Sequence, residues 1–166
     1  DIRKLGLKGY IFNLIGAWIE KKLGNLVGVS PGSEMKIAID LAIKQKAQIA
    51  LIDQDIIITL KRLSKLRIKE KLKFVYDLIK GFVIRKQEYN FDLRKVPPEE
   101  LIKKVLRLIK KRYPHLYKIL IEERNSVMAK NLYTIIKDNK EKKVFVIVGA
   151  GHLPGLLNEI KRYDKS

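Results

Sequence analysis

The sequence predicts an α/β fold that is predominantly helical and contains a small parallel sheet. Apolar residues recur at helical spacing over most of the chain. Two short continuous apolar runs, residues 48–53 and 143–148, are instead typical of strands buried on both faces. Because two strands alone do not form a stable sheet, we expect this sheet to be incomplete without a missing N-terminal part or a partner chain.

Helices account for the other expected elements, in one domain covering residues 1–166. Residues 5–23 carry apolar side chains on one broad face, and Gly24 and Gly28 follow where that helix ends. A second helix begins near Ser30 or Ser33, either of which can cap it. Further helical patterns cover residues 56–63, 68–84, 97–109, 116–137 and 154–163.

The charge of the chain is strongly positive. There are 36 Lys and Arg residues against 18 Asp and Glu, a formal net charge of +18. Such a balance can indicate binding to nucleic acid or to an anionic membrane. Here the basic residues are spread along every amphipathic segment, and no nucleic-acid-binding motif is present. We interpret the abundant Ile, Leu and Lys and the scarce Gln, Met and Cys as heat adaptation, and expect no specific nucleic-acid partner.

The composition also excludes some kinds of site. Without cysteine there are no disulfides, thiolate metal sites or cysteine nucleophiles. No secretory signal is visible, and no apolar run approaches the roughly 20 residues that span a bilayer. The chain begins at Asp1 rather than at Met, which we interpret as the sign of a piece of a longer protein.

Each predicted strand leads into polar residues and then a helix. The first is followed by Asp53 and Asp55, and the second by Gly149, Gly151 and His152. In parallel neighbours these groups would meet at the carboxyl end of the sheet, where ligands bind in open α/β folds. The alternatives are structural: aspartate is a favoured helix cap, and His152 would be a loop residue that caps the last helix.

Two more charged residues are candidates for the site. Glu34 falls in a first helical turn, where the helix dipole favours a carboxylate in any case. Arg124 shares a helix face with Met128, so it lies on or beside a buried stripe. A cation there needs an acidic partner or an anionic ligand, and a structural ion pair would satisfy it equally well.

Four stretches together resemble a known family. "PGSEM", "IALIDQDI", "ERNSVMA" and "VIVGAGHLPG" occur in the order seen in an archaeal or bacterial member of the TraB/PrgY family, which is related to the Tiki proteins. The resemblance runs from about residue 5 to residue 160. It corresponds to the C-terminal portion of the TraB domain: the second G-x-x-H motif is Gly149 to His152, and the first is lacking.

The resemblance implies a metal-dependent protease or related hydrolase that acts on a peptide or protein, with a divalent metal in the intact protein. The residues it implies are His152, Glu34 and Arg124 as catalytic groups, His152 and Glu34 as metal ligands, and Gly149, Gly151, Asp53, Asp55 and Asn125 as binding residues. Lacking the first motif histidine, this portion is expected to be inactive alone.

The family also implies an alternative function and a location. Some relatives shut down peptide pheromone signalling, which binding without cleavage would achieve. We expect the full-length protein to be membrane-associated through segments outside this chain, and this portion to be soluble on the cytoplasmic side. We further expect the portion to form a homo-oligomer through its unfinished sheet.

Overall fold

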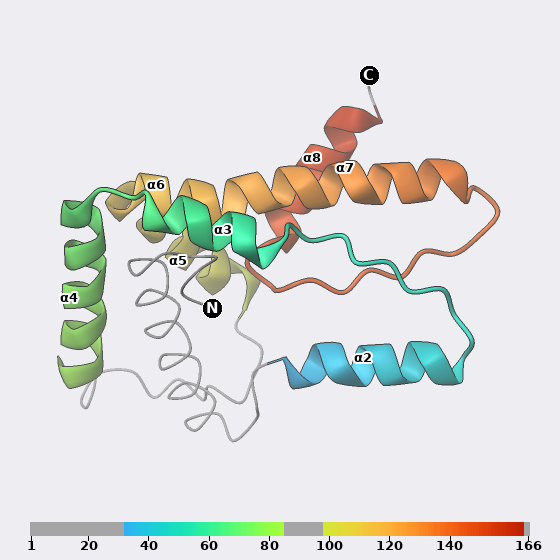
Figure 1. The fold of residues 1–166 in the computed structure, drawn as a ribbon, viewed down its shortest axis with the longest axis horizontal. Coiled ribbons are helices and arrows are strands. Elements are labelled where there is room, and N and C mark those ends of the chain that lie inside the picture. Colours follow the sequence, from blue (N-terminus) through green and yellow to red (C-terminus); the bar gives the residue numbers. More distant parts are fainter. Residues whose placement is uncertain (1–31, 85–97, 165–166) are drawn as a thin grey trace.

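A computed structural model describes residues 32–84 and 98–164, and every regular element in them is helical (Figure 1). The helix predicted over residues 5–23 lies outside the described residues. None of the described helices is long and apolar enough to cross a membrane. The elements are α2 (Ser33–Lys44), α3 (Ile56–Ser64), α4 (Ile68–Ile84), α5 (Glu99–Arg112), α6 (Pro114–Tyr117), the π-helix η1 (Lys118–Glu122), α7 (Glu123–Asp138) and α8 (Leu153–Tyr163).

The predicted parallel sheet is wrong. Residues 48–53 and 143–148 form no strand, and no sheet is present anywhere in residues 32–84 and 98–164. Leu51 is 87% exposed and Phe145 is 89% exposed, so these apolar runs are not buried between helices. A run of apolar residues indicates only a preference for burial, whereas a strand also needs a neighbouring backbone to pair with. The first run is instead held to α7 by a side-chain hydrogen bond, in which Asn131 Nδ2 donates to the carbonyl oxygen of Ile52 at 2.9 Å.

The helix boundaries follow local chemistry. Asp55 caps α3 by accepting a hydrogen bond from the backbone N–H of Ile57 at 2.7 Å, as expected for an aspartate before a helix. Proline stands in the first turn of α6, where its missing N–H costs nothing. The N-cap of α2 is Gly32 at a φ of 79° rather than Ser33, and Ser30 lies outside the described residues.

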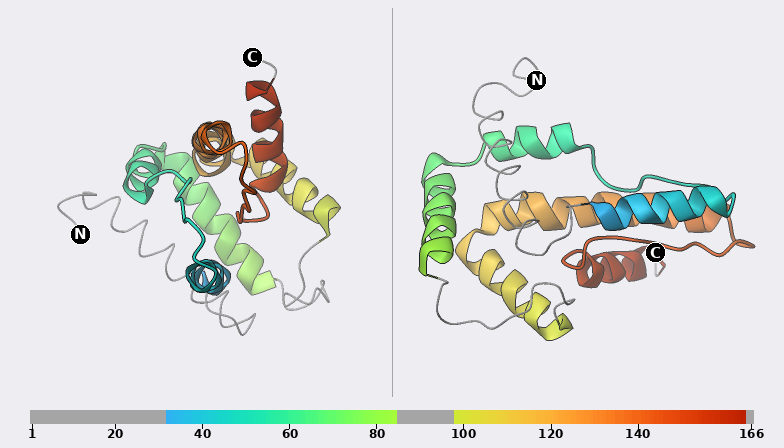
Figure 2. Two further views of the ribbon diagram at one scale, coloured as in Figure 1. Left: turned by 90° about the vertical axis from the view of Figure 1, so that its right-hand side faces the viewer. Right: turned by 90° about the horizontal axis from the view of Figure 1, so that it is seen from below.

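A long helical rod organises the molecule. It comprises α6, η1 and α7, close to the single helix predicted over residues 116–137, and α3 lies beside it (Figure 1). The π turn closes with the N–H of Glu123 donating to the carbonyl of Lys118, five residues back. Helix α8 packs on α7, α4 stands at one end of the rod, and α2 lies apart from both α7 and α8 (Figures 1 and 2).

Two apolar clusters hold the rod to its neighbours. The first joins α3 to the α5–α6–η1 end through Leu63, Tyr113, Leu116 and Ile119. The second joins α7 to α8 through Met128, Ala129, Leu132 and Leu156. Each large side chain buried in this way contributes about 1.5–3 kcal/mol relative to exposure. The first turn of α7 lies between the two clusters along the rod.

Candidate functional site

The structure brings together four of the predicted site residues, Asp53, Arg124, Asn125 and His152, which we call the polar cluster. Asp53 follows the apolar run before α3, Arg124 and Asn125 lie in the first turn of α7, and His152 is the N-cap of α8. The carboxylate and guanidinium are 71 residues apart in sequence, and the amide and imidazole 27. Tertiary packing, rather than any local motif, therefore assembles the cluster.

An ion pair forms one half of the polar cluster. Arg124 Nη2 donates to Asp53 Oδ2 at 2.6 Å and Arg124 Nε donates to Asp53 Oδ1 at 3.1 Å, a two-pronged arrangement that fixes both groups. Partial burial raises the pKa of the Asp53 carboxyl, but the hydrogen bonds and charge of Arg124 outweigh this and hold the pKa below its usual value. Asp53 is therefore a carboxylate at neutral pH.

A buried hydrogen bond forms the other half. Asn125 and His152 are only 4% and 8% exposed, and Asn125 Oδ1 lies 2.8 Å from His152 Nδ1. An amide oxygen can only accept, so Nδ1 carries the proton and Nε2 keeps its lone pair. Burial and the neighbouring Arg124 charge lower the pKa of His152, although Asp53 acts in the opposite direction. The imidazole is thus held neutral in one tautomer.

The glycine-rich loop before α8 forms a turn that positions the His152 imidazole. The N–H of His152 donates to the carbonyl of Gly149 at 2.8 Å, closing a tight turn, and the His152 carbonyl accepts from Leu156 N–H at 2.9 Å in the first helical turn. His152 is therefore the N-cap residue, as the structural alternative expected, but its side chain makes no capping bond. The backbone starts the helix while the ring remains available to Asn125.

The other predicted site residues lie elsewhere or serve the backbone. Glu34 is exposed on α2, which lies apart from α7 and α8 (Figures 1 and 2). Asp55 is the cap of α3. A Cβ added at Gly149 would lie 3.6 Å from His152 Cδ2, and one at Gly151 would lie 3.7 Å from Leu106 Cδ2, both ordinary contacts. The structure therefore places Glu34 on a separate helix and gives Asp55 a capping role.

Sequence reasoning missed Gly155, a glycine that packs directly against Asn125 of the polar cluster. A Cβ at Gly155 would lie 2.1 Å from Asn125 Nδ2, far inside any real contact distance. The available signal was a glycine in the first turn of a predicted helix, where alanine would be the better helix former. Such a glycine indicates close packing against a neighbouring element.

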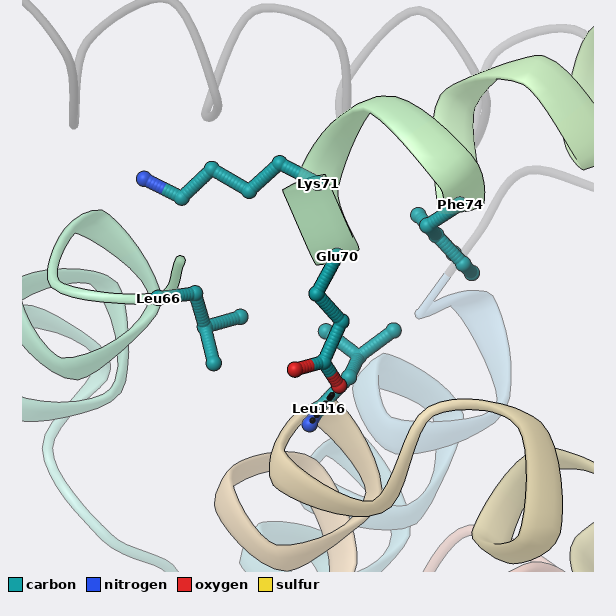
Figure 3. A pocket seen from close by; sticks show the side chains of 5 residues that line it. All are labelled: Leu66, Glu70, Lys71, Phe74 and Leu116. Atoms are coloured by element: carbon teal, nitrogen blue, oxygen red, sulfur yellow. Dashed lines mark hydrogen bonds between the residues drawn. The ribbon is translucent and has the colours of Figure 1, made fainter. Parts of the chain in front are cut away.

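A second group of side chains, which contains Glu70 and Lys71, joins α4 to α6. Leu66, Glu70, Lys71, Phe74 and Leu116 line a recess under α4 that is too small to admit a water molecule (Figure 3). Glu70 Oε1 accepts from the N–H of Leu116 at 3.2 Å, and Glu70 Oε2 lies 3.0 Å from Nδ1 of His115. The carboxylate therefore fastens α4 to the start of α6.

The polar cluster does not by itself make a metal centre. Among residues 32–84 and 98–164 there is no group of three or more His, Cys, Asp or Glu side chains that could hold an ion. Of the three carboxylates expected near His152, Asp53 is paired with Arg124, Asp55 caps α3 and Glu34 lies on α2. A divalent metal bound at His152 would need further ligands from outside the described residues.

The sequence of this chain is similar to known proteins. The chain belongs to the TraB/PrgY/gumN family, whose family model matches residues 17–164. It is 38% identical over 162 residues to an uncharacterized protein of the archaeon Methanocaldococcus jannaschii. That match covers 95% of this chain but 39% of the relative, so the chain spans about two fifths of the relative's length. No solved structure matches the chain significantly.

Proposed function

We propose that this chain supplies part of a hydrolase site in a protein that acts on peptides, with His152 as the group that performs chemistry. The observation that carries the proposal is the buried hydrogen bond between Asn125 Oδ1 and His152 Nδ1. It leaves an unprotonated Nε2 on an imidazole whose pKa is lowered by burial and by Arg124. A neutral nitrogen of this kind is what both a general base and a metal ligand require.

The chemistry open to His152 without further groups is proton transfer. As the oxygen of an attacking water bonds to a peptide carbonyl carbon, Nε2 accepts the proton that the water releases. When the carbon–nitrogen bond breaks, the same nitrogen returns that proton to the leaving amine. The ion pair of Asp53 and Arg124 keeps the surroundings of the ring fixed throughout.

We include a divalent metal in the proposal only for the whole protein, and not for this chain alone. The family resemblance implies such a metal, but the described residues do not complete a set of ligands for it. In the intact protein, the metal would supply a Lewis acid for the carbonyl or the water. This chain would contribute His152 Nε2 to it.

The second candidate function is peptide binding without cleavage. It is favoured by the exposed apolar side chains of the two runs that lead to the polar cluster, above all Leu51 and Phe145. Such side chains can cover the apolar residues of a bound peptide. In this case the cluster would hold the loops in place and would not perform a reaction.

Peptide cleavage by the full-length protein distinguishes these functions. Unstructured peptides are incubated with wild-type protein and with His152→Ala, and new chain ends are detected by mass spectrometry. The hydrolase proposal expects cleavage that His152→Ala reduces at least a hundredfold, since general acid–base groups contribute about 10²–10⁴-fold. The matched control is His115→Ala. It removes the other histidine of the chain, which is exposed and distant from His152 in the sequence.

Two outcomes contradict the proposal. Cleavage that persists unchanged in His152→Ala would show that the ring does no chemistry. Peptide binding without cleavage, equally tight in wild type and His152→Ala, would favour the binding function instead. Repeating the assay with a chelator tests the metal separately from the histidine.

A further inference from the structure

The first turn of α8 touches Asn125 at a position that has no side chain. Gly155 lies three residues after His152, and a Cβ built on it would lie 2.1 Å from Asn125 Nδ2 and 3.2 Å from Asn125 Cγ. Real Cβ atoms do not approach heavy atoms closer than 3.0 Å. Every residue other than glycine at position 155 must therefore displace the Asn125 amide or push α8 away from α7.

Separating α8 from α7 is the harder of these two displacements. The backbone of Asn125 belongs to the rod, and one turn later Met128 and Ala129 are 2% and 0% exposed against α8. On the α8 side, Leu156 is 2% exposed in the same cluster. The least constrained movement is rotation of the Asn125 side chain. Rotation carries Oδ1 away from His152 Nδ1, which is 2.8 Å from it.

We propose that Gly155 is a positioning residue that sets the tautomer of His152. Its missing Cβ leaves the space in which the Asn125 amide sits with its nitrogen toward α8 and its oxygen toward the imidazole. That oxygen holds the proton on Nδ1 and leaves Nε2 free. With a Cβ at position 155, Nδ1–H loses its acceptor, and the ring shifts toward the tautomer protonated on Nε2, which is the favoured form of an unconstrained neutral imidazole.

The inference concerns geometry that exists whatever reaction the protein performs. Its consequence for activity, the loss of the lone pair on Nε2, rests on the function proposed above. Gly149 and Gly151 differ from Gly155 in this respect, because a Cβ at either would make only ordinary contacts. Gly151→Ala is therefore a matched control that adds the same methyl group to the same part of the chain.

Nitrogen-15 NMR of the imidazole reports the tautomer directly. At a pH well above the ordinary histidine pKa, wild type and Gly151→Ala should show a protonated Nδ1 and an unprotonated Nε2 at His152. Gly155→Ala and Asn125→Ala should both show the Nε2 signal moving toward the protonated value. An unchanged His152 spectrum in folded Gly155→Ala would overturn the proposal.

If Gly155→Ala is too unstable for NMR, thermal unfolding tests the overlap between position 155 and Asn125 instead. Alone, Gly155→Ala should lower the Tm because of the overlap with Asn125. In an Asn125→Ala background the overlap is gone, and the same substitution should raise the Tm, since alanine is the better helix former. A substitution that shifts the Tm equally in both backgrounds would overturn the proposal.

The activity assay separates this inference from the proposed function. A shifted tautomer together with unchanged peptide cleavage would leave the positioning role intact and contradict the hydrolase proposal. An unshifted tautomer would contradict the positioning role, and the effect of His152→Ala on cleavage would still decide the function.

Discussion

Both titratable groups of the polar cluster have lowered pKa values, and both shifts act on stability in the same direction. The Arg124 guanidinium outweighs partial burial at Asp53, and burial together with Arg124 lowers the pKa of His152. In each case the unfolded chain takes up a proton at a higher pH than the folded chain does. Stability that is present above the ordinary pKa is therefore lost as the pH falls through the folded value.

Acidification should weaken the fold first through His152. The free energy of unfolding, measured with denaturant, should fall as the pH drops below about 6.5, the ordinary pKa of histidine. In His152→Gln this part of the pH dependence should shrink, because glutamine does not titrate. His115→Gln is the matched control and should retain it. A pH profile identical in wild type and His152→Gln would show that His152 is not shifted.

Some residue roles could be predicted from sequence and others could not. Asp55 is predicted as a binding residue, with helix capping as the structural alternative, and the structure confirms the capping role. For Arg124, beside the buried stripe, the sequence predicts either an acidic partner or an anionic ligand, and the structure shows the acidic partner, Asp53. The bond between Asn125 and His152 had no local signal, because it depends on how α8 lies on α7.

At the scale of elements, the interface of α7 and α8 determines whether the polar cluster exists. Leu156 and Leu157 are adjacent on α8, but they are 2% and 49% exposed. Leu156→Ala should lower the free energy of unfolding by about 2–5 kcal/mol, the usual cost of truncating a buried leucine. Leu157→Ala should change it by less than about 0.5 kcal/mol, as surface substitutions do.

Denaturant unfolding of the two variants checks this prediction. Equal losses in Leu156→Ala and Leu157→Ala would mean that α8 does not pack on α7 through the face described. Because both substitutions replace leucine by alanine in the same helix, helix propensity cancels in the comparison.

Helices were predictable here because each carries its own signals. Apolar spacing, prolines and caps placed α3, α4, α5 and α8 within a few residues of their observed bounds. Strands could not be predicted in the same way, because residues 48–53 and 143–148 are apolar but have no neighbouring backbone to pair with. The π turn at Lys118–Glu122 was also missed, since one extra residue in a helix leaves the apolar pattern nearly unchanged.

At the scale of the whole molecule, charge opposes compaction. The formal net charge of +18 means that like charges repel one another more in the folded chain than in the expanded one. Salt screens this repulsion, with a Debye length of about 30 Å at 0.01 M and about 10 Å at 0.1 M. The Tm should therefore rise between these two concentrations of sodium chloride.

Circular dichroism at the two salt concentrations measures the effect. A neutral osmolyte at matched osmolality is the control, because it does not screen charge. A Tm that falls on adding salt would show that attraction within ion pairs, such as that of Arg62 with Glu123, outweighs the general repulsion.

The sequence separation of the polar cluster has a practical consequence for finding what the protein recognises. Asp53, Arg124 and His152 are neighbours only when the run before α3 and helix α8 have both docked on α7. A compound that contacts all three would hardly bind the denatured chain. At a hundred times its Kd it would stabilise the protein by about 2.7 kcal/mol, so a melting-temperature screen of small peptides and metal ions would reveal it before any reaction is known.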